Sequence, residues 1–234
     1  MSGPITAALG ARTIVAPGIA DLRFDLRTPA TLAFAGGQFV SLSVDPALPR
    51  RSYSIASQSD RPESIRIILR VIEGGPASEY LMTLPLGAVI PMTGAHGFFT
   101  LEPQHAGDIV FAATGTGVAA VMPMLGELAR QAPTGRRVLH WGLRHQEDIF
   151  ALDEITDLCQ RSGTTLDLHL SQPAPGWTGA RGRITQTVLA ALPSLSAPTF
   201  YLVGNGAMIE ELKRELVAQG VNRKKQIRTE AFFD

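Results

Sequence analysis

The hydrophobic pattern changes its period near Glu102 and Pro103, and this change constrains the fold more than any other feature. Before it, apolar and polar residues alternate with a period of two, for example over residues 22–27 and 40–44. Such alternation is typical of half-buried strands, and glycine-rich turns separate these segments. We therefore predict two domains, the first a small antiparallel β-barrel over residues 1–103.

Beyond this point, short apolar runs alternate with helical patterns. The apolar runs are expected to be strands, at residues 109–113, 138–143, 166–170, 200–203 and 226–232. The helical patterns lie at about 118–130, 148–161, 184–192 and 208–219. Strands that alternate with helices form doubly wound α/β folds. Residues 104–234 should thus contain a parallel five-stranded sheet.

The amino-acid composition excludes several classes of function for this chain. The 21 basic and 21 acidic residues balance, so no charge excess indicates a nucleic acid or an anionic membrane as partner. Residues 109–126 carry no charge, but Pro123 and a run of glycines favour a strand, a turn and a buried helix over a membrane span. A single cysteine, Cys159, cannot form a disulfide, a cysteine zinc cluster or an iron–sulfur cluster. We expect a soluble, cytoplasmic protein without a metal site.

Two glycine turns follow predicted strands of the parallel sheet. Ligands bind beyond the carboxyl ends of such strands, and glycines let the backbone approach a pyrophosphate at a helix N-terminus. The first and fourth strands flank the switch point of a sheet ordered 3-2-1-4-5, so both turns should face one crevice. A tight strand–helix turn without a ligand would give the same pattern. The turns contain Thr114, Gly115, Thr116, Gly117, and Gly204, Asn205, Gly206.

The barrel half has two candidate sites of its own. One is the extended segment Arg51, Ser52, Tyr53, Ser54, in which the arginine could hold phosphate, the aromatic ring could stack and a hydroxyl could bond a ring nitrogen. It could equally be a polar strand. The other is the turn at Gly75, Pro76, Ala77 and Ser78, where a helix begins and could bind a second phosphate, or simply be capped.

The order of these motifs resembles the ferredoxin-NAD(P)H reductase superfamily, from about residue 10 onwards. The resemblance rests on short segments in the family's order. They are residues 51–54, 75–78, Gly94-Ala95-His96-Gly97-Phe98, 114–117, Gly142-Leu143-Arg144, 204–208 and Glu230-Ala231-Phe232. It implies a flavin-binding barrel, a nucleotide domain, and hydride transfer between NADH or NADPH and a bound flavin.

For the barrel, the resemblance implies FAD rather than FMN. Arg51 would bind the flavin phosphates, Tyr53 would pack on the isoalloxazine, and Ser54 would lie near its hydride-accepting nitrogen. Ser52 is a further cofactor-binding candidate. Gly75, Ala77 and Ser78 would cradle the pyrophosphate.

For the second domain, the resemblance implies that the first glycine turn binds the pyrophosphate of the nicotinamide nucleotide. Ser54 and Glu230 would be the catalytic residues, with Glu230 near the nicotinamide and the flavin. Phe232 and Phe233 are stacking candidates, although packing explains them equally well. The remaining nucleotide-binding candidates are Arg144, Gly204, Asn205, Gly206 and Met208.

The sequence departs from the family pattern at three positions. Val203 stands where a cysteine is common, which removes a sulfur contact to the nicotinamide. Ala120 and Ala95 replace prolines that usually follow the first glycine turn and the glycine of the 94–98 segment. We expect the fold to tolerate all three.

The lone cysteine implies an external acceptor, namely a small iron–sulfur protein or a flavodoxin, for a protein expected to be a monomer. Two alternatives remain: a reductase that releases free reduced flavin, and a non-catalytic electron-transfer or regulatory subunit, which Val203 favours.

Nucleotide choice depends on the end of the third strand of the parallel sheet. NADPH-dependent members commonly place serine and arginine there, whereas this chain has Ser171 and Gln172. The segment Trp177-Thr178-Gly179 also favours NADH, while Arg144, Arg181 and Arg183 could still reach a 2′-phosphate.

Overall fold

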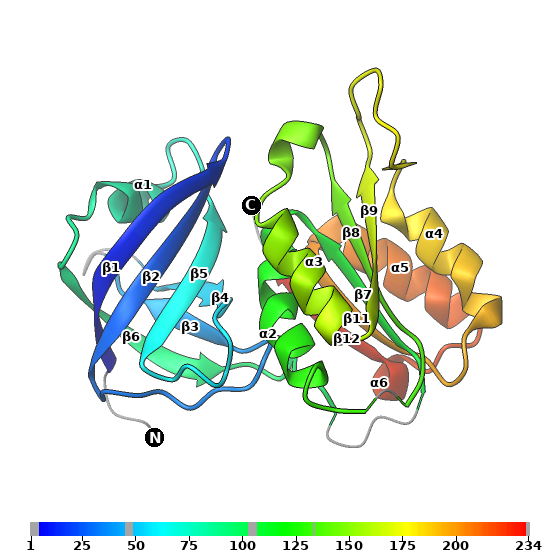
Figure 1. Ribbon diagram of the computed structural model, residues 1–234, viewed down its shortest axis with the longest axis horizontal. Helices are drawn as coiled ribbons and strands as arrows, with labels where there is room; N and C mark the ends of the chain where they lie inside the picture. The colour runs from blue at the N-terminus through cyan, green and yellow to red at the C-terminus, as the bar shows by residue number, and fades with distance from the viewer. Residues whose placement is uncertain (1–4, 45–48, 103–106, 133, 233–234) are drawn as a thin grey trace.

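The computed structural model describes residues 5–44, 49–102, 107–132 and 134–232. Two six-stranded sheets lie side by side, one antiparallel and one parallel (Figure 1). The predicted boundary between the two domains, at residues 103–104, lies outside the described residues.

The antiparallel sheet forms the expected barrel. Its strands run in the order β4-β3-β6-β1-β2-β5. The first and last strands of this order, β4 and β5, also meet. The backbone N–H of Ala56, just after β4, donates to Arg66 O of β5 at 2.8 Å, and this contact closes the barrel. The elements are β1 Ile5–Ala16, β2 Ile19–Thr28, β3 Phe39–Leu42, β4 Arg51–Ser54, β5 Ser64–Arg70, α1 Pro76–Thr83 and β6 Val89–His96.

The parallel sheet has the order β10-β9-β8-β7-β11-β12, so the five predicted strands follow the expected 3-2-1-4-5 arrangement. The expected strand count was one too low, because β10 at Ala180–Arg181 has only two residues and carries no periodic signal. The strands are β7 Ile109–Thr114, β8 Arg137–Leu143, β9 Thr164–Leu170, β11 Thr199–Asn205 and β12 Ile227–Phe232.

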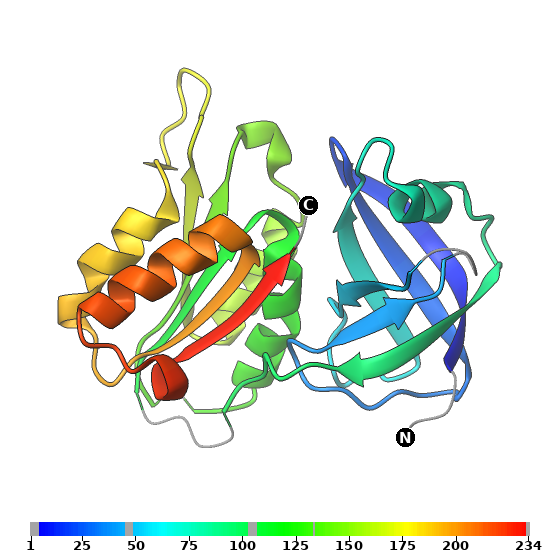
Figure 2. The same ribbon diagram turned by 180° about the vertical axis from the view of Figure 1, so that it is seen from behind.

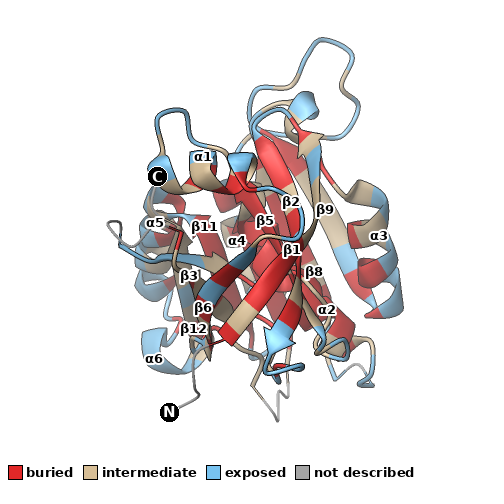
Figure 3. Ribbon diagram, turned by 90° about the vertical axis from the view of Figure 1, so that its left-hand side faces the viewer, coloured by how far each residue is buried: buried red, intermediate tan, exposed pale blue. Residues whose placement is uncertain are grey.

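Helices cover both faces of this sheet, α2 and α3 on one and α4 and α5 on the other (Figures 1 and 2). The central strand β7 is apolar and buried from Ile109 to Ala113, because helices cover both of its faces. Figure 3 shows buried segments along the strands of both sheets. The helices are α2 Val118–Leu128, α3 Leu152–Arg161, α4 Ile184–Ala191, α5 Gly206–Ala218 and α6 Arg223–Gln226. Three short 3₁₀ turns lie at Gly115–Gly117, Gln146–Asp148 and Leu192–Ser194.

Most predicted helices are confirmed with shifted ends, and α6 was missed because four polar residues show no period. The charge-free segment at 109–126 divides into β7, a 3₁₀ turn and α2, as expected. Among the described residues, every helix is too short or too polar to cross a bilayer.

The two domains share a core and polar contacts. Ala56, Ile68 and Phe99 of the barrel half belong to the same buried cluster as α2. Glu127 Oε1 of α2 accepts from the Gly36 backbone N–H at 2.6 Å. Arg66 of β5 joins Asp21 of the barrel to Glu154 of α3 at 2.6 and 2.7 Å. These contacts hold the barrel against the α2–α3 side of the parallel sheet.

Candidate functional site

A cleft of about 760 Å³ opens at the carboxyl ends of the parallel strands. Its volume is in the range typical of small-molecule sites. The cleft is lined by both glycine turns, by the ends of β8 and β9, and by Arg70 and Ile72 at the end of barrel strand β5. Eight residues predicted from the sequence line it: Thr114, Gly115, Thr116, Arg144, Gly204, Asn205, Met208 and Phe232.

The two glycine turns touch each other, as the strand order predicts. The Asn205 N–H donates to Thr114 Oγ1 at 2.9 Å. A Cβ atom on Gly204 would lie 2.5 Å from Thr114 O, and the residue has φ +112°, which favours glycine. A Cβ on Gly117 would lie 3.0 Å from the Gly204 Cα. Both glycines are thus needed for the close approach of the backbones, whether or not a ligand is bound.

Asn205 also begins the helix α5. Its side chain accepts from the Met208 N–H at 3.1 Å and caps the helix. Gly206 is the first residue of α5 but does not line the cleft. Gly117 is buried against β11 and acts through packing. Of these residues, Asn205 and Met208 line the cleft, whereas Gly117 and Gly206 do not.

The two predicted catalytic residues, 176 positions apart, meet across the domain junction. Ser54 Oγ at the end of β4 donates to Glu230 Oε1 of β12 at 2.6 Å. In the parallel ladder, Glu230 is paired with Val203 of β11, which is fully buried. Two residues further along β12, Phe232 lines the cleft. The Ser54–Glu230 hydrogen bond therefore joins the end of the barrel segment 51–54 to strand β12, which borders the cleft.

The surroundings of Glu230 favour its neutral form. Burial raises the pKa of the Glu230 carboxyl above its ordinary value, and the hydrogen bond from Ser54 offsets only part of this effect. A carboxyl group with a raised pKa can hold or release a proton closer to neutral pH. The arrangement can therefore position a proton at Glu230 Oε1.

The side chains of barrel segment 51–54 differ in exposure and in hydrogen bonding. Arg51 is exposed, and no hydrogen bond or ion pair to the described residues occupies its guanidinium. Tyr53 is half-buried against the barrel core, and burial raises its pKa to about 12, so its hydroxyl stays protonated. Ser52 Oγ lies 3.0 Å from Ser41 Oγ. As far as the described part of the chain shows, the Arg51 guanidinium is available to an anion.

The turn before α1 differs from its expected use in one respect. Ser78 is buried, and its hydroxyl is committed to the loop, accepting from the Ile72 N–H at 3.0 Å. Gly75 is the N-cap without a side-chain cap, but its own N–H donates to Ile72 O at 2.9 Å and its carbonyl accepts from the Glu79 N–H at 3.0 Å. Ala77 thus stays a binding candidate through its backbone N–H at the start of α1, whereas Gly75 and Ser78 shape the loop.

Sequence reasoning missed several cleft residues. Arg70 and Ile72 belong to the barrel and reach the cleft only because the domains dock, which no local pattern reports. His145 and Asp148 follow β8, where Asp148 Oδ2 accepts from the His145 N–H at 2.8 Å. Because they lie two and five residues after the end of a predicted parallel strand, the sequence could have indicated that they border the ligand site. Phe233, a stacking candidate, lies outside the described residues.

Comparison with known proteins defines the class. An oxidoreductase FAD-binding domain matches residues 6–101, and an oxidoreductase NAD-binding domain matches residues 111–214. The protein is thus a flavoprotein oxidoreductase that uses FAD and a nicotinamide nucleotide and transfers electrons. Ferredoxin–NADP reductase B of Sorangium cellulosum is 33% identical over 234 residues, covering 94% of this chain and 95% of that protein. The chain belongs to the ferredoxin-NAD(P)H reductase superfamily, as the resemblance of its motifs implied.

Other relatives share the fold within longer chains. The reductase component DmpP of phenol 2-monooxygenase from Pseudomonas sp. is 25% identical, and this chain spans 63% of its length. The Amycolatopsis cytochrome P450 reductase GcoB superposes with a TM-score of 0.88 at 24% identity, covering 98% of this chain and 70% of that one. A Neisseria gonorrhoeae ferredoxin NADP⁺ reductase with bound FAD and NADP gives 0.83 at 21% identity, with full coverage of both chains.

Proposed function

We propose that this chain passes electrons from a nicotinamide nucleotide, through FAD, to a separate small iron–sulfur protein or flavodoxin. The 2.6 Å hydrogen bond from Ser54 to Glu230 is the main support for this proposal. It joins the segment expected to hold the flavin to the strand that borders the nucleotide cleft.

The residues of the barrel fit a flavin with an anionic phosphate group. Arg51, whose guanidinium has no hydrogen bond or ion pair to the described residues, would bind phosphate, and the backbone N–H of Ala77 would bind a second phosphate at the start of α1. Tyr53 would pack on the ring system, with its body against the barrel core. The bound flavin supplies the exchange between two-electron and one-electron steps.

The residues of the second domain would orient the nucleotide. At Gly115, which lines the cleft, the place that a side chain would take is open, so the backbone of the first turn would approach the pyrophosphate there. Phe232 lines the cleft beside the junction and would exclude water from the reacting rings. Glu230 would hold a proton at Oε1, and Ser54 would fix the direction of that carboxyl group.

The cysteine count and the relatives support an external acceptor. One cysteine cannot bind an iron–sulfur cluster, and Cys159 is buried, with burial raising its pKa to about 12. One relative is named as a ferredoxin reductase and another as the reductase component of a monooxygenase. Both names describe electron delivery to a separate protein or component.

Steady-state turnover tests this proposal. We expect the FAD-loaded protein to oxidise NADH or NADPH with ferricyanide, and to reduce an added ferredoxin or flavodoxin in the same assay. Nucleotide oxidation that depends on added free flavin, and that yields free reduced flavin, would instead identify a flavin reductase. Absence of turnover with every acceptor would identify a non-catalytic subunit.

We predict that NADH is the preferred nucleotide. Gln172 stands where an arginine would contact a 2′-phosphate, and one lost charged contact costs about 1.5–3 kcal/mol, roughly tenfold to a hundredfold in affinity. Of the candidate cations, Arg144 and Arg183 line the cleft, and Arg183 is paired with Glu211 at 2.5 Å. The Arg181 guanidinium is turned to Trp177 O at 2.7 Å.

The ratio of kcat/KM for NADH and NADPH, measured at fixed salt, checks this prediction. Arg183→Ala should change only the NADPH value, and Arg181→Ala is its matched control outside the cleft. A preference for NADPH in the wild type, lost in Arg183→Ala, would contradict the prediction and identify Arg183 as the 2′-phosphate ligand.

A further inference from the structure

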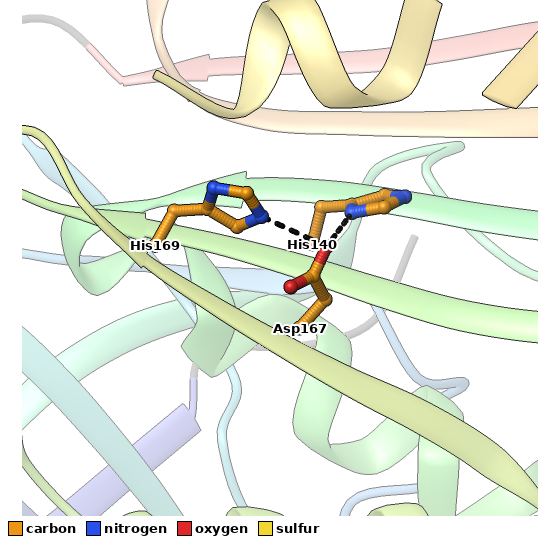
Figure 4. A group of neighbouring side chains, drawn as sticks. All are labelled: His140, Asp167 and His169. Atoms are coloured by element: carbon orange, nitrogen blue, oxygen red, sulfur yellow. Dashed lines mark hydrogen bonds and ion pairs between the residues drawn. The ribbon is translucent and has the colours of Figure 1, made fainter. Parts of the chain in front are cut away.

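Three ionisable side chains gather inside the second domain, away from the Ser54–Glu230 pair. His140 lies on β8, and Asp167 and His169 lie on the neighbouring strand β9 (Figure 4). In the parallel ladder, His140 is paired directly with Asp167. Side chains two apart on a strand share a face, so Asp167 and His169 point to the same side of the sheet.

That side is the face covered by α4 and α5. Leu139 and Trp141 of β8, and Leu166 and Leu168 of β9, belong to the core beneath α2 and α3. Residues at alternate positions face the opposite way, which places the three ionisable side chains on the other layer. The cluster is thus separate from the core at the domain junction.

The cluster converges on one carboxylate oxygen. Asp167 Oδ2 lies 2.8 Å from His140 Nδ1 and 2.8 Å from His169 Nε2. The three ligand atoms all lie within 4.8 Å of one another. Tetrahedral ligands at about 2.1 Å from an ion are separated by about 3.4 Å, so small side-chain rotations would open a site between them.

The burial of the three side chains and their access to solvent are also compatible with a bound metal ion. Both histidine side chains are 5% exposed, which holds their rings in place, whereas Asp167 is 30% exposed and gives solvent a path to the cluster. We propose that His140, Asp167 and His169 form a binding site for a divalent transition metal ion of the zinc class. Two imidazole nitrogens and one carboxylate oxygen are a ligand set for such ions, with a fourth position left for water.

The outer nitrogens set the strength of this site. With the ring protons facing Asp167, His140 Nε2 and His169 Nδ1 are bare, and neither has a hydrogen-bond partner among the described residues. Metal binding moves a proton onto each of these nitrogens, where an outer partner is normally present. Lack of such a partner typically costs 10–100-fold in metal affinity. The site should therefore bind zinc reversibly.

Calorimetric titration of the chelator-treated, FAD-loaded protein with Zn²⁺ tests the site. We expect one Zn²⁺ per chain, a higher thermal unfolding midpoint with Zn²⁺, and neither effect with Mg²⁺, which prefers oxygen ligands. Asp167→Asn should weaken zinc binding by at least 10–100-fold, since it removes the charged ligand. Asp157→Asn, on the exposed face of α3, is the matched control and should bind zinc as the wild type does.

The absence of stoichiometric zinc binding to the wild type would overturn the proposal. The proposal would also be overturned if the Asp167→Asn variant folds, retains its flavin and binds zinc with unchanged affinity. The wild-type comparison of Zn²⁺ with Mg²⁺ decides the question if Asp167→Asn does not fold. In either case the cluster would be a carboxylate that orients two buried histidines. The proposal is independent of the electron-transfer function, because no residue of the cluster belongs to the cleft.

Discussion

Glu230→Gln should slow flavin reduction by the nucleotide, or flavin re-oxidation by the acceptor, by about 100-fold while FAD stays bound. A positioned side chain that carries a proton typically contributes 10²–10⁴-fold. Glutamine retains the oxygen that accepts the 2.6 Å hydrogen bond from Ser54, so the junction should keep its shape. Anaerobic stopped-flow measurement of both half-reactions checks the prediction.

The matched control is Glu210→Gln, an exposed residue of α5 that pairs with Lys213, and it should leave both rates unchanged. Wild-type rates of Glu230→Gln in both half-reactions would contradict a role for this carboxyl group.

The same substitution should affect stability with a definite sign. Burial raises the pKa of Glu230, so the folded protein binds this proton more tightly than the unfolded chain does. The favourable contribution is complete below the unfolded pKa and is lost as pH rises through the folded pKa. Glu230→Gln should therefore be at least as stable as the wild type at neutral pH, with an advantage that disappears in acid. Denaturant unfolding at both pH values measures this difference.

Arg51→Ala should weaken FAD binding by roughly tenfold to a hundredfold. The substitution removes a charge-assisted phosphate contact worth about 1.5–3 kcal/mol. The fold should be unaffected, because the exposed Arg51 side chain has no hydrogen bond or ion pair among the described residues. The ratio of flavin to protein after gel filtration, together with a titration of the apoprotein with FAD, measures the change.

The neighbouring Arg50→Ala is the matched control. Its guanidinium lies at 3.4 Å from Thr93 Oγ1, so this variant removes a charge of the same kind one residue away. Unchanged flavin content in Arg51→Ala would remove Arg51 from the binding site.

The fold could be predicted because its signals are local and repeated. The change from alternation to apolar runs separates the two sheets, and the apolar strand β7 lies at the centre of the parallel sheet as its composition indicates. The two-residue strand β10 could not be predicted, since its pairing with His169 and Leu170 is set by the neighbouring strand. The helix α6 has only four residues, which is too short for a periodic pattern.

The site was predictable where chemistry lies at a strand end. The two glycine turns meet because the switch point lies between β7 and β11. The contact of Ser54 with Glu230 depends on domain docking, and only the family resemblance implied that both residues act at one place. The same limit hid Arg70 and Ile72. It also hid the cluster of His140 with Asp167 and His169, which depends on the register of two strands.

In this protein, one domain junction would bring a bound flavin next to the nucleotide cleft. An anaerobic titration of the purified, FAD-loaded protein with NADH, and of a second sample with NADPH, measures whether the two are coupled. We predict bleaching of the flavin absorption that is complete at about one nucleotide per flavin, with NADH the more effective. A flavin spectrum that neither nucleotide changes would contradict it.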